Sequence, residues 1–205
     1  MVNSNSKLIF NYGAMNSGKT KELLKVWYSK KEDGFYPIIM KPMRDDKGDD
    51  TVVSRDGAFA KANFLIKDGD NIYFEISKYI LENNIDCIIV DEVQFLTSVQ
   101  IDQLGSIVDE FGIDVICYGL LTDFQGKMFG ASKRLMEIAD DRIEMERQCV
   151  CGRKRIFNAR FVDGEFVLEG EQVAIDGKNA EYKSRCRQCY KKLVKQLNFN
   201  NKNNN

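Results

Sequence analysis

Histidine is absent from the 205 residues of this chain. Imidazole general bases and His metal ligands are therefore excluded, and acid–base chemistry near neutral pH falls to carboxylates, Cys, Lys or Tyr. An excess of one charge is also missing, because the net charge is −1 although 30% of the residues are charged. This balance argues against nucleic acid as a partner, since proteins that bind it usually carry a basic surface.

Long apolar runs are missing as well. The N-terminal sequence MVNSNSKLIF lacks the apolar core of a signal peptide. No stretch approaches the roughly 18 to 20 apolar residues that cross a bilayer. We therefore expect a soluble, cytoplasmic protein without a membrane partner. Its length suits either one domain with a substantial core or such a domain with a small appendage.

Four short apolar runs have the composition of buried strands. Their hydrophobicity is continuous rather than alternating, which is typical of a sheet covered on both faces. The segments between them carry apolar residues at helical spacing. The expected strands are 8–12, 36–41, 86–91 and 115–119, and the expected helices are 18–30, 71–83 and 99–111. This alternation indicates a three-layer α/β domain with a mostly parallel sheet.

The C-terminal quarter of the chain has a different texture. The polar, Asp-rich segment 41–57 is predicted to be a loop, but after about residue 142 short β-like runs at 155–161 and 165–169 lie between two pairs of cysteines. The Asn-rich end has the composition of a disordered tail. The expected division is 1–145 for the α/β domain, 146–193 for a second domain and 194–205 for the tail.

The segment GAMNSGKT matches the phosphate-binding pattern of Gly, four residues, Gly, Lys and Ser or Thr. Glycines let such a loop turn so that successive N–H groups point at phosphates. Lys19 would reach the β- and γ-phosphate oxygens, and the Thr20 hydroxyl would join a Mg²⁺ shell. The flanking strand and helix patterns favour this interpretation over a plain strand–turn–helix. The candidate ATP-binding residues are Gly13, Ala14, Met15, Asn16, Ser17, Gly18, Lys19 and Thr20.

The apolar run CIIVDE ends in two acidic residues. Asp91 matches the carboxylate that holds Mg²⁺, directly or through water, in P-loop proteins. Glu92 follows at the expected carboxyl end of a strand, where ligands bind in open α/β sheets. It could accept a proton from water in an ATPase or from an alcohol in a small-molecule kinase. The alternative for Glu92 is a surface or ion-paired role.

Four of the six cysteines form two close pairs near the C-terminus. Cys186-Arg-Gln-Cys189 has the spacing of a zinc knuckle, and Cys149-Val-Cys151 is tighter. Because histidine is absent, the consistent structural site is Cys₄, which would stabilise a small domain and do no chemistry. Four free thiols are the alternative. The other two cysteines lie in apolar runs and are expected to be buried hydrophobic residues.

The segment GLLTDFQGKMFGAS follows the fourth expected strand, so it also lies at the carboxyl edge of the sheet. Phe124 and Phe129 sit there among small and polar residues. They could line a pocket of the size of a nucleobase, or they could pack into the core, and both interpretations stay open from the sequence.

In this order, GAMNSGKT, VDEVQF, TDFQGKMFG and a cysteine-paired C-terminal lobe resemble the cytosolic-type (type II) thymidine kinases. The resemblance covers about residues 8–193. It implies a P-loop α/β domain with a small zinc-ribbon-like lobe, whose lasso loop closes over thymine. It implies Mg²⁺-dependent transfer of the γ-phosphoryl group of ATP to the 5′-hydroxyl of thymidine, in nucleoside salvage. It also implies a homotetramer and feedback inhibition by thymidine triphosphate.

The resemblance also implies roles for individual residues. Glu92 becomes the catalytic base, and Thr20 and Asp91 belong to the Mg²⁺ site. Apart from the resemblance, the position of Arg160 before the lasso, roughly 161–182, makes it a candidate phosphate contact. The structural Zn²⁺ ligands are Cys149, Cys151, Cys186 and Cys189. The thymidine pocket maps onto Met15, Phe95, Leu120, Phe124, Phe129 and Tyr182, with lasso main-chain contacts from Val173, Ile175 and Gly177.

The sequence departs from the family pattern in three places. The family's phosphate loop usually reads GPMFSGK, and here Ala14 and Asn16 replace Pro and Phe, although neither position supplies a phosphate ligand by its side chain. Arg55 stands where the family often has a histidine, which leaves a metal role of the following Asp56 open. Cys149 is displaced by one position from the usual spacing of the first pair.

Two other function classes stay open from the sequence. One is a P-loop ATPase coupled to conformational change, in which Glu92 would activate water; no arginine-finger arrangement or repeat domain supports it. The other is a zinc ribbon that binds nucleic acid and is carried on a P-loop domain. The near-neutral charge argues against that second class.

Overall fold

The computed structural model describes residues 5–43, 50–170, 172 and 180–203. Within these residues a six-stranded sheet forms the centre of the molecule, and all of its strand pairs are parallel. From edge to edge the strands are β5 (Phe64–Ile66), β2 (Pro37–Pro42), β6 (Cys87–Val90), β7 (Asp114–Gly119), β1 (Leu8–Tyr12) and β8 (Asp141–Glu144). The parallel α/β prediction is confirmed.

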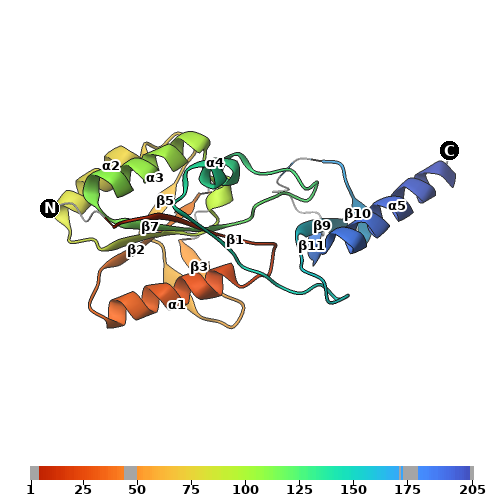
Figure 1. Ribbon diagram of the computed structural model, residues 1–205, viewed down its shortest axis with the longest axis horizontal. Helices are drawn as coiled ribbons and strands as arrows, with labels where there is room; N and C mark the ends of the chain where they lie inside the picture. The colour runs from red at the N-terminus through yellow and green to blue at the C-terminus, as the bar shows by residue number, and fades with distance from the viewer. Residues whose placement is uncertain (1–4, 44–49, 171, 173–179, 204–205) are drawn as a thin grey trace.

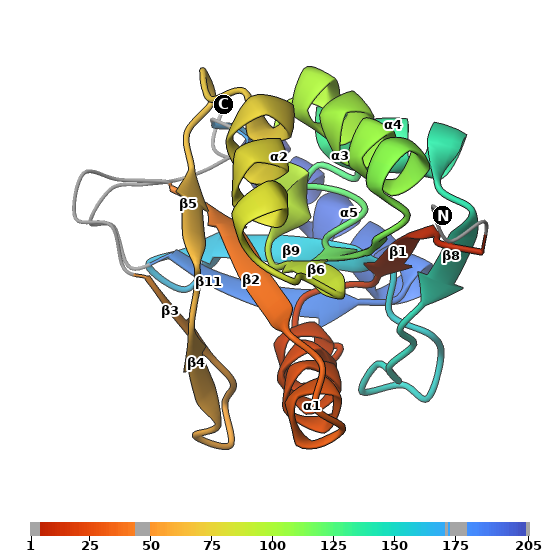
Figure 2. The same cartoon turned by 90° about the vertical axis from the view of Figure 1, so that its left-hand side faces the viewer.

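Helices cover both faces of this sheet (Figures 1 and 2). The helices α2 (Ile72–Glu82), α3 (Ser98–Phe111) and α4 (Gly130–Ile138) lie on one face, and α1 (Lys19–Glu32) lies on the other. A two-stranded antiparallel ribbon, β3 (Thr51–Val53) with β4 (Phe59–Lys61), lies on the α1 side. Three layers result because the central strands are apolar on both faces and each face needs a cover.

Two apolar clusters fill the spaces between the layers. The larger lies between the sheet and α2, α3 and α4, and includes Phe10, Ile88 and Leu104, each 0% exposed. The smaller lies under α1 and includes Leu23 and Ile89. Local signals place α3 firmly, because Thr97 and Gln100 form a capping box at its start and Gly112 ends it in a left-handed conformation.

The C-terminal lobe lies beyond the carboxyl ends of the central strands (Figure 1). In its described residues an antiparallel sheet has the order β10 (Glu165–Val167), β9 (Phe157–Val162), β11 (Ala180–Arg185). The helix α5 (Arg187–Asn203) packs on it and then extends away from the rest of the molecule.

The structure differs from the sequence predictions in several segments. The predicted tail is helical through Asn203, because Leu193, Val194 and Leu197 pack against the lobe and α5 continues past them. The segment predicted to be a loop contains β3, and neither α4 nor the edge strands β8 and β11 were predicted. No helix in the described ranges is long and apolar enough to cross a membrane.

Candidate active site

A cavity of about 570 Å³ opens at the carboxyl ends of β1, β6 and β7, against the lobe strands β9 and β11. Loops that follow three neighbouring parallel strands meet at this edge, as expected for ligand sites in such sheets. The lining residues used below are Met15, Asn16, Ser17, Gly18, Lys19, Thr20, Lys21, Arg55, Asp56, Glu92, Gln94, Phe95, Leu120, Thr122, Asp123, Phe124, Phe129, Arg147, Asn158, Gln172 and Tyr182.

The P-loop follows β1 and carries the strained geometry that phosphate loops require. A Cβ on Gly13 would lie 2.6 Å from the Met145 carbonyl oxygen, and Gly18 has φ of +91°, so both glycines are needed. Asn16 also has a positive φ, of 65°, which Asn tolerates better than most residues. Lys19 is buried, and its Nζ donates to the Ala14 carbonyl at 3.1 Å. Burial lowers the pKa of Lys19, while Glu92 and Asp91 act in the opposite direction.

The acidic pair follows β6. Burial, and then repulsion from Glu92, raise the pKa of Asp91 to about 7. Glu92 has a positive φ of 50°, unusual for a residue other than Gly, Asn or Asp, so the turn that presents it is held by its surroundings. Gln94 supplies part of that hold: its Nε2 donates to Glu92 Oε2 at 2.5 Å, and its Oε1 accepts from the Leu120 N–H at 2.9 Å.

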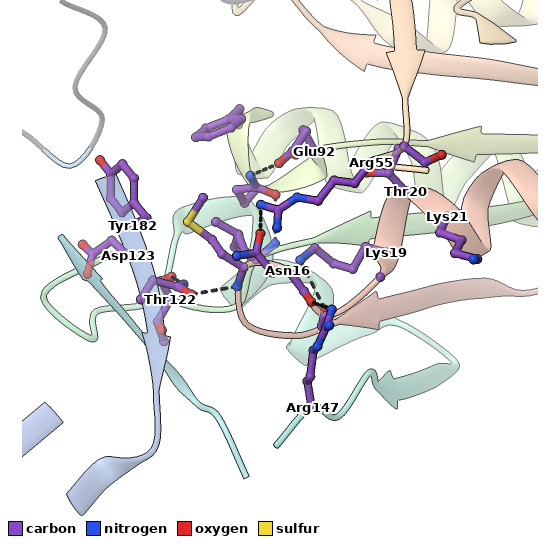
Figure 3. A pocket seen from close by; sticks show the side chains of 18 of the residues that line it. Asn16, Lys19, Thr20, Lys21, Arg55, Glu92, Thr122, Asp123, Arg147 and Tyr182 are labelled. Atoms are coloured by element: carbon purple, nitrogen blue, oxygen red, sulfur yellow. Dashed lines mark hydrogen bonds between the residues drawn. The ribbon is translucent and has the colours of Figure 1, made fainter. Parts of the chain in front are cut away.

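One end of the cavity is aromatic. Phe95 and Phe129 meet edge to face with ring centroids 5.7 Å apart, and Phe124 is 2% exposed. Core packing and pocket lining were the two alternatives for Phe124 and Phe129. Both apply, because both rings are buried and both line the cavity. Tyr182 and Asp123 lie on the lobe side of this end (Figure 3). The first part of the lasso is tied here, because Gln172 Nε2 donates to Asp123 Oδ2 at 3.0 Å.

The other end of the cavity is basic. Figure 3 shows Arg55 and Arg147 reaching Asn16 from opposite sides. Arg55 donates to the Asn16 side chain, and Arg147 donates to the Asn16 carbonyl at 2.6 Å. Lys21 forms an ion pair with Asp56, and the hydrogen bond from Lys21 holds the pKa of Asp56 at about 2. The positive charges of Lys19, Arg55 and Arg147 favour binding of a polyanion at this end.

The four predicted zinc ligands converge at the start of the lobe. The Sγ atoms of Cys149, Cys151, Cys186 and Cys189 all lie within 4.8 Å of one another. Such a cluster fits one tetrahedral Zn²⁺, whose Zn–S bonds are about 2.3 Å long. Cys149 belongs to the cluster in spite of its one-residue displacement in the sequence.

The structure brings most of the predicted site residues together, although their roles stay predictions. Gly13 and Ala14, the first two residues of the P-loop, line a smaller neighbouring pocket and not the main cavity. Asp91 is buried beside Glu92. The predicted lasso contacts Val173, Ile175 and Gly177 lie outside the described residues.

Sequence reasoning missed several polar residues at this site, among them Gln94, Asn158 and Arg147. Gln94 lies two positions after Glu92 in VDEVQF, so its proximity was a usable signal. Asn158 and Arg147 come from the lobe and from the segment that leads into it, and no local pattern marks either of them.

Comparison with known proteins agrees with this arrangement. A family model described as thymidine kinase matches residues 6–190. The thymidine kinase of Enterobacteria phage T4 is 42% identical over 195 residues, covering 94% of this chain and 99% of the phage protein. Thymidine kinases of Shewanella oneidensis and Haemophilus influenzae are each 40% identical, covering 92% and 94% of this chain and 98% and 100% of their own lengths. By these matches over nearly its whole length, the chain belongs to the thymidine kinase family.

Proposed function

We propose that this chain transfers the γ-phosphoryl group of ATP to the 5′-hydroxyl of thymidine. The observation that carries the proposal is the position of Glu92. Its carboxylate is fixed by Gln94 in a cavity that has a phosphate loop at one end and aromatic rings at the other. An acceptor hydroxyl held between these ends would lie close to both the base and the phosphate chain.

The phosphate end would bind ATP through the backbone N–H groups that begin α1, with Lys19 on the β- and γ-phosphates. In the structure Lys19 is turned back onto loop carbonyls, so a bound phosphate chain would replace those contacts. Arg55 and Arg147 add positive charge beside the loop.

Thr20 and Asp91 would hold Mg²⁺. Oxygen donors suit this ion. The buried Asp91 carboxylate and the neighbouring Glu92 carboxylate repel each other, and a cation would offset their negative charge. When bound, Mg²⁺ neutralises charge on the transferring phosphate.

Glu92 would act as the general base that accepts the proton of the 5′-hydroxyl. The Gln94 amide keeps the carboxylate aimed by donating to one oxygen, which leaves the other oxygen for the substrate. The chain has no histidine that could take this role instead.

The aromatic end would bind the thymine base. Phe95, Leu120, Phe124 and Phe129 supply apolar and aromatic surface, and Met15 and Tyr182 complete the wall. We extend the proposal to main-chain contacts from Val173, Ile175 and Gly177 on the strength of the family resemblance.

The four cysteines would hold a structural Zn²⁺ that fixes the lobe and takes no part in the chemistry. The family resemblance further supports three proposals: assembly as a homotetramer, inhibition by thymidine triphosphate and a cytoplasmic location. We also propose the division into an α/β domain at 1–145 and a zinc lobe at 146–193.

Transfer of labelled phosphate from ATP to a panel of deoxynucleosides tests the function. We expect thymidine to be the preferred acceptor and ATP turnover to require a nucleoside. Hydrolysis of ATP at a comparable rate without any nucleoside would instead favour an ATPase, in which Glu92 activates water.

A further inference from the structure

Side chains of the lobe form hydrogen bonds to both the backbone N–H and the backbone carbonyl of Met15 in the P-loop. The Met15 N–H donates to Asn158 Oδ1 at 2.7 Å, and the Met15 carbonyl accepts from Ser184 Oγ at 2.5 Å. Asn158 lies on β9 and Ser184 on β11, and the two are register partners in the lobe sheet. Each is 2% exposed. One cross-strand pair of the lobe sheet therefore holds the loop through both of its side chains.

The Asn158 side chain also reaches a third segment. Its Nδ2 donates to the Thr122 carbonyl at 3.0 Å, at the start of the segment that carries Phe124 and Phe129. The two partners fix the orientation of the amide, because an N–H must face the oxygen and a carbonyl must face the NH₂ group. A single buried side chain thus joins the phosphate loop to the aromatic end of the cavity.

These bonds are not needed to complete the lobe. The Asn158 side-chain contacts run to backbone groups of two substrate-facing loops of the α/β domain. Backbone groups in such irregular loops lack helix or strand partners, and a buried group left without one is costly. The lobe therefore supplies what the loops cannot supply themselves.

We propose that Asn158, with Ser184 as its partner, is a positioning residue that sets the phosphate loop and the nucleoside pocket at a fixed separation. The inference rests on the proposed function, since it matters most when two substrates must meet in line. Phosphoryl transfer depends on that alignment, and displacements of about 1 Å can cost roughly 10²-fold in rate.

The test uses Asn158→Ala and Ser184→Ala in the full-length, zinc-loaded protein. ATP affinity is measured with a fluorescent ATP analogue without nucleoside, and the thymidine KM and kcat are measured separately. Two controls bracket the result. Asn63→Ala removes a side-chain bond to the Ile39 N–H outside the cavity. Tyr190→Phe removes a lobe bond to the Phe124 carbonyl that does not involve the P-loop.

In Asn158→Ala we expect the Kd of the ATP analogue and the KM for thymidine to rise together, each by about 3- to 30-fold. Ser184→Ala raises the Kd of the analogue by a similar factor. In the double variant the Kd of the analogue rises by less than the product of the two single factors, because both side chains hold the same residue, Met15. Tyr190→Phe changes the thymidine KM at most, and Asn63→Ala changes neither constant.

A purely structural role for Asn158 predicts something else: a smaller active fraction, with kcat per active molecule, the Kd and the KM all unchanged. That result, or independent multiplication of the two single effects, overturns the proposal. If the wild-type protein fails to phosphorylate thymidine, the proposed function is wrong. The Kd of the ATP analogue, compared between wild type and variants, still tests whether Asn158 and Ser184 position the P-loop. Should Asn158→Ala not fold, Ser184→Ala and its Kd decide the matter.

Discussion

The α/β domain and the C-terminal lobe meet at one cavity but are stabilised in different ways. The domain has apolar clusters on both faces of its sheet, with many side chains that are 0% exposed. Among the described residues of the lobe, the buried cluster consists of Ala159, Phe166 and Tyr190. A unit this small seldom holds itself together by packing alone, and usually needs a metal or disulfides.

The two regions also contribute different kinds of side chain to the site. The domain supplies the charged groups, Lys19 and Glu92, on loops anchored by buried strands. The lobe supplies side chains such as Asn158, which hold those loops in place. We therefore expect changes in the domain to affect the chemical step, and changes in the lobe to affect whether the site is assembled.

The largest effect is expected from Cys186→Ser, which removes one of the four clustered thiols. Zinc binding supplies folding free energy directly in small domains, on the order of 10 kcal/mol or more. The lobe should unfold, zinc should fall well below one ion per chain, and thymidine phosphorylation should drop to background. Elemental analysis and the phosphate-transfer assay measure the two losses.

The α/β domain should survive this substitution. Trp27 is the single tryptophan of the chain and lies on α1, so its fluorescence reports unfolding of the domain alone. Cys87→Ala is the matched control, because Cys87 is buried in β6 away from the cluster. Full zinc content in Cys186→Ser, or a loss of zinc in Cys87→Ala, would contradict the assignment of the ligands.

The second prediction concerns the domain. Glu92→Gln keeps the shape of the side chain but removes its ability to accept a proton, so kcat should fall by at least about 10²-fold. Binding of an ATP analogue should stay nearly intact, since the P-loop is unchanged. Glu110→Gln on α3 is a control of the same chemistry away from the cavity. A near-normal kcat in Glu92→Gln would mean that another group is the base.

The same division explains what the sequence could predict. The strands β1, β6 and β7 and the loops after them carry local signals: continuous apolar runs, a glycine-rich loop and an acidic pair. Those signals gave the parallel sheet correctly and led to residues that line one cavity. The local sequence is informative there because each strand is buried on both faces and leads directly into a site loop.

The lobe was less predictable. The strand β11 was missed, and the part of α5 from residue 194 onward was predicted to be a tail. The cysteine spacing did indicate the cluster. Asn158 and Ser184 act on Met15 from 143 and 169 positions away in the sequence, and Asn158 acts on Thr122 from 36 positions away. No propensity or periodicity encodes contacts of that range, so the residues that join the two regions appear only in the folded structure.

A smaller effect is expected from Arg147→Met, which alters the segment between domain and lobe. Arg147 is exposed and donates to the Asn16 carbonyl at 2.6 Å, so it helps to hold the left-handed turn of the P-loop. We expect the Kd of an ATP analogue to rise about 2- to 10-fold, with less effect at high salt. Arg142→Met is the control, because its partner Met136 lies outside the cavity. An unchanged Kd would mean that the hydrogen bond from Arg147 does not contribute to holding the loop for ATP.

The smallest expected effect belongs to the domain and depends on pH. The hydrogen bond from Lys21 lowers the pKa of Asp56 from 3.8 to about 2 in the folded state. A carboxyl with a depressed pKa stabilises the fold above its unfolded pKa, and this contribution disappears as the pH falls through the folded pKa. Lys21→Met should therefore lower the Tm seen by Trp27 fluorescence at pH 6 by at most about 2 °C, since the pair is exposed. The difference from wild type should shrink steadily between pH 4 and pH 2.

Zinc should be released over the same acid range in both proteins, because protonated thiols lose the metal. A difference in Tm that grows towards pH 2 would show that Lys21 acts through something other than Asp56.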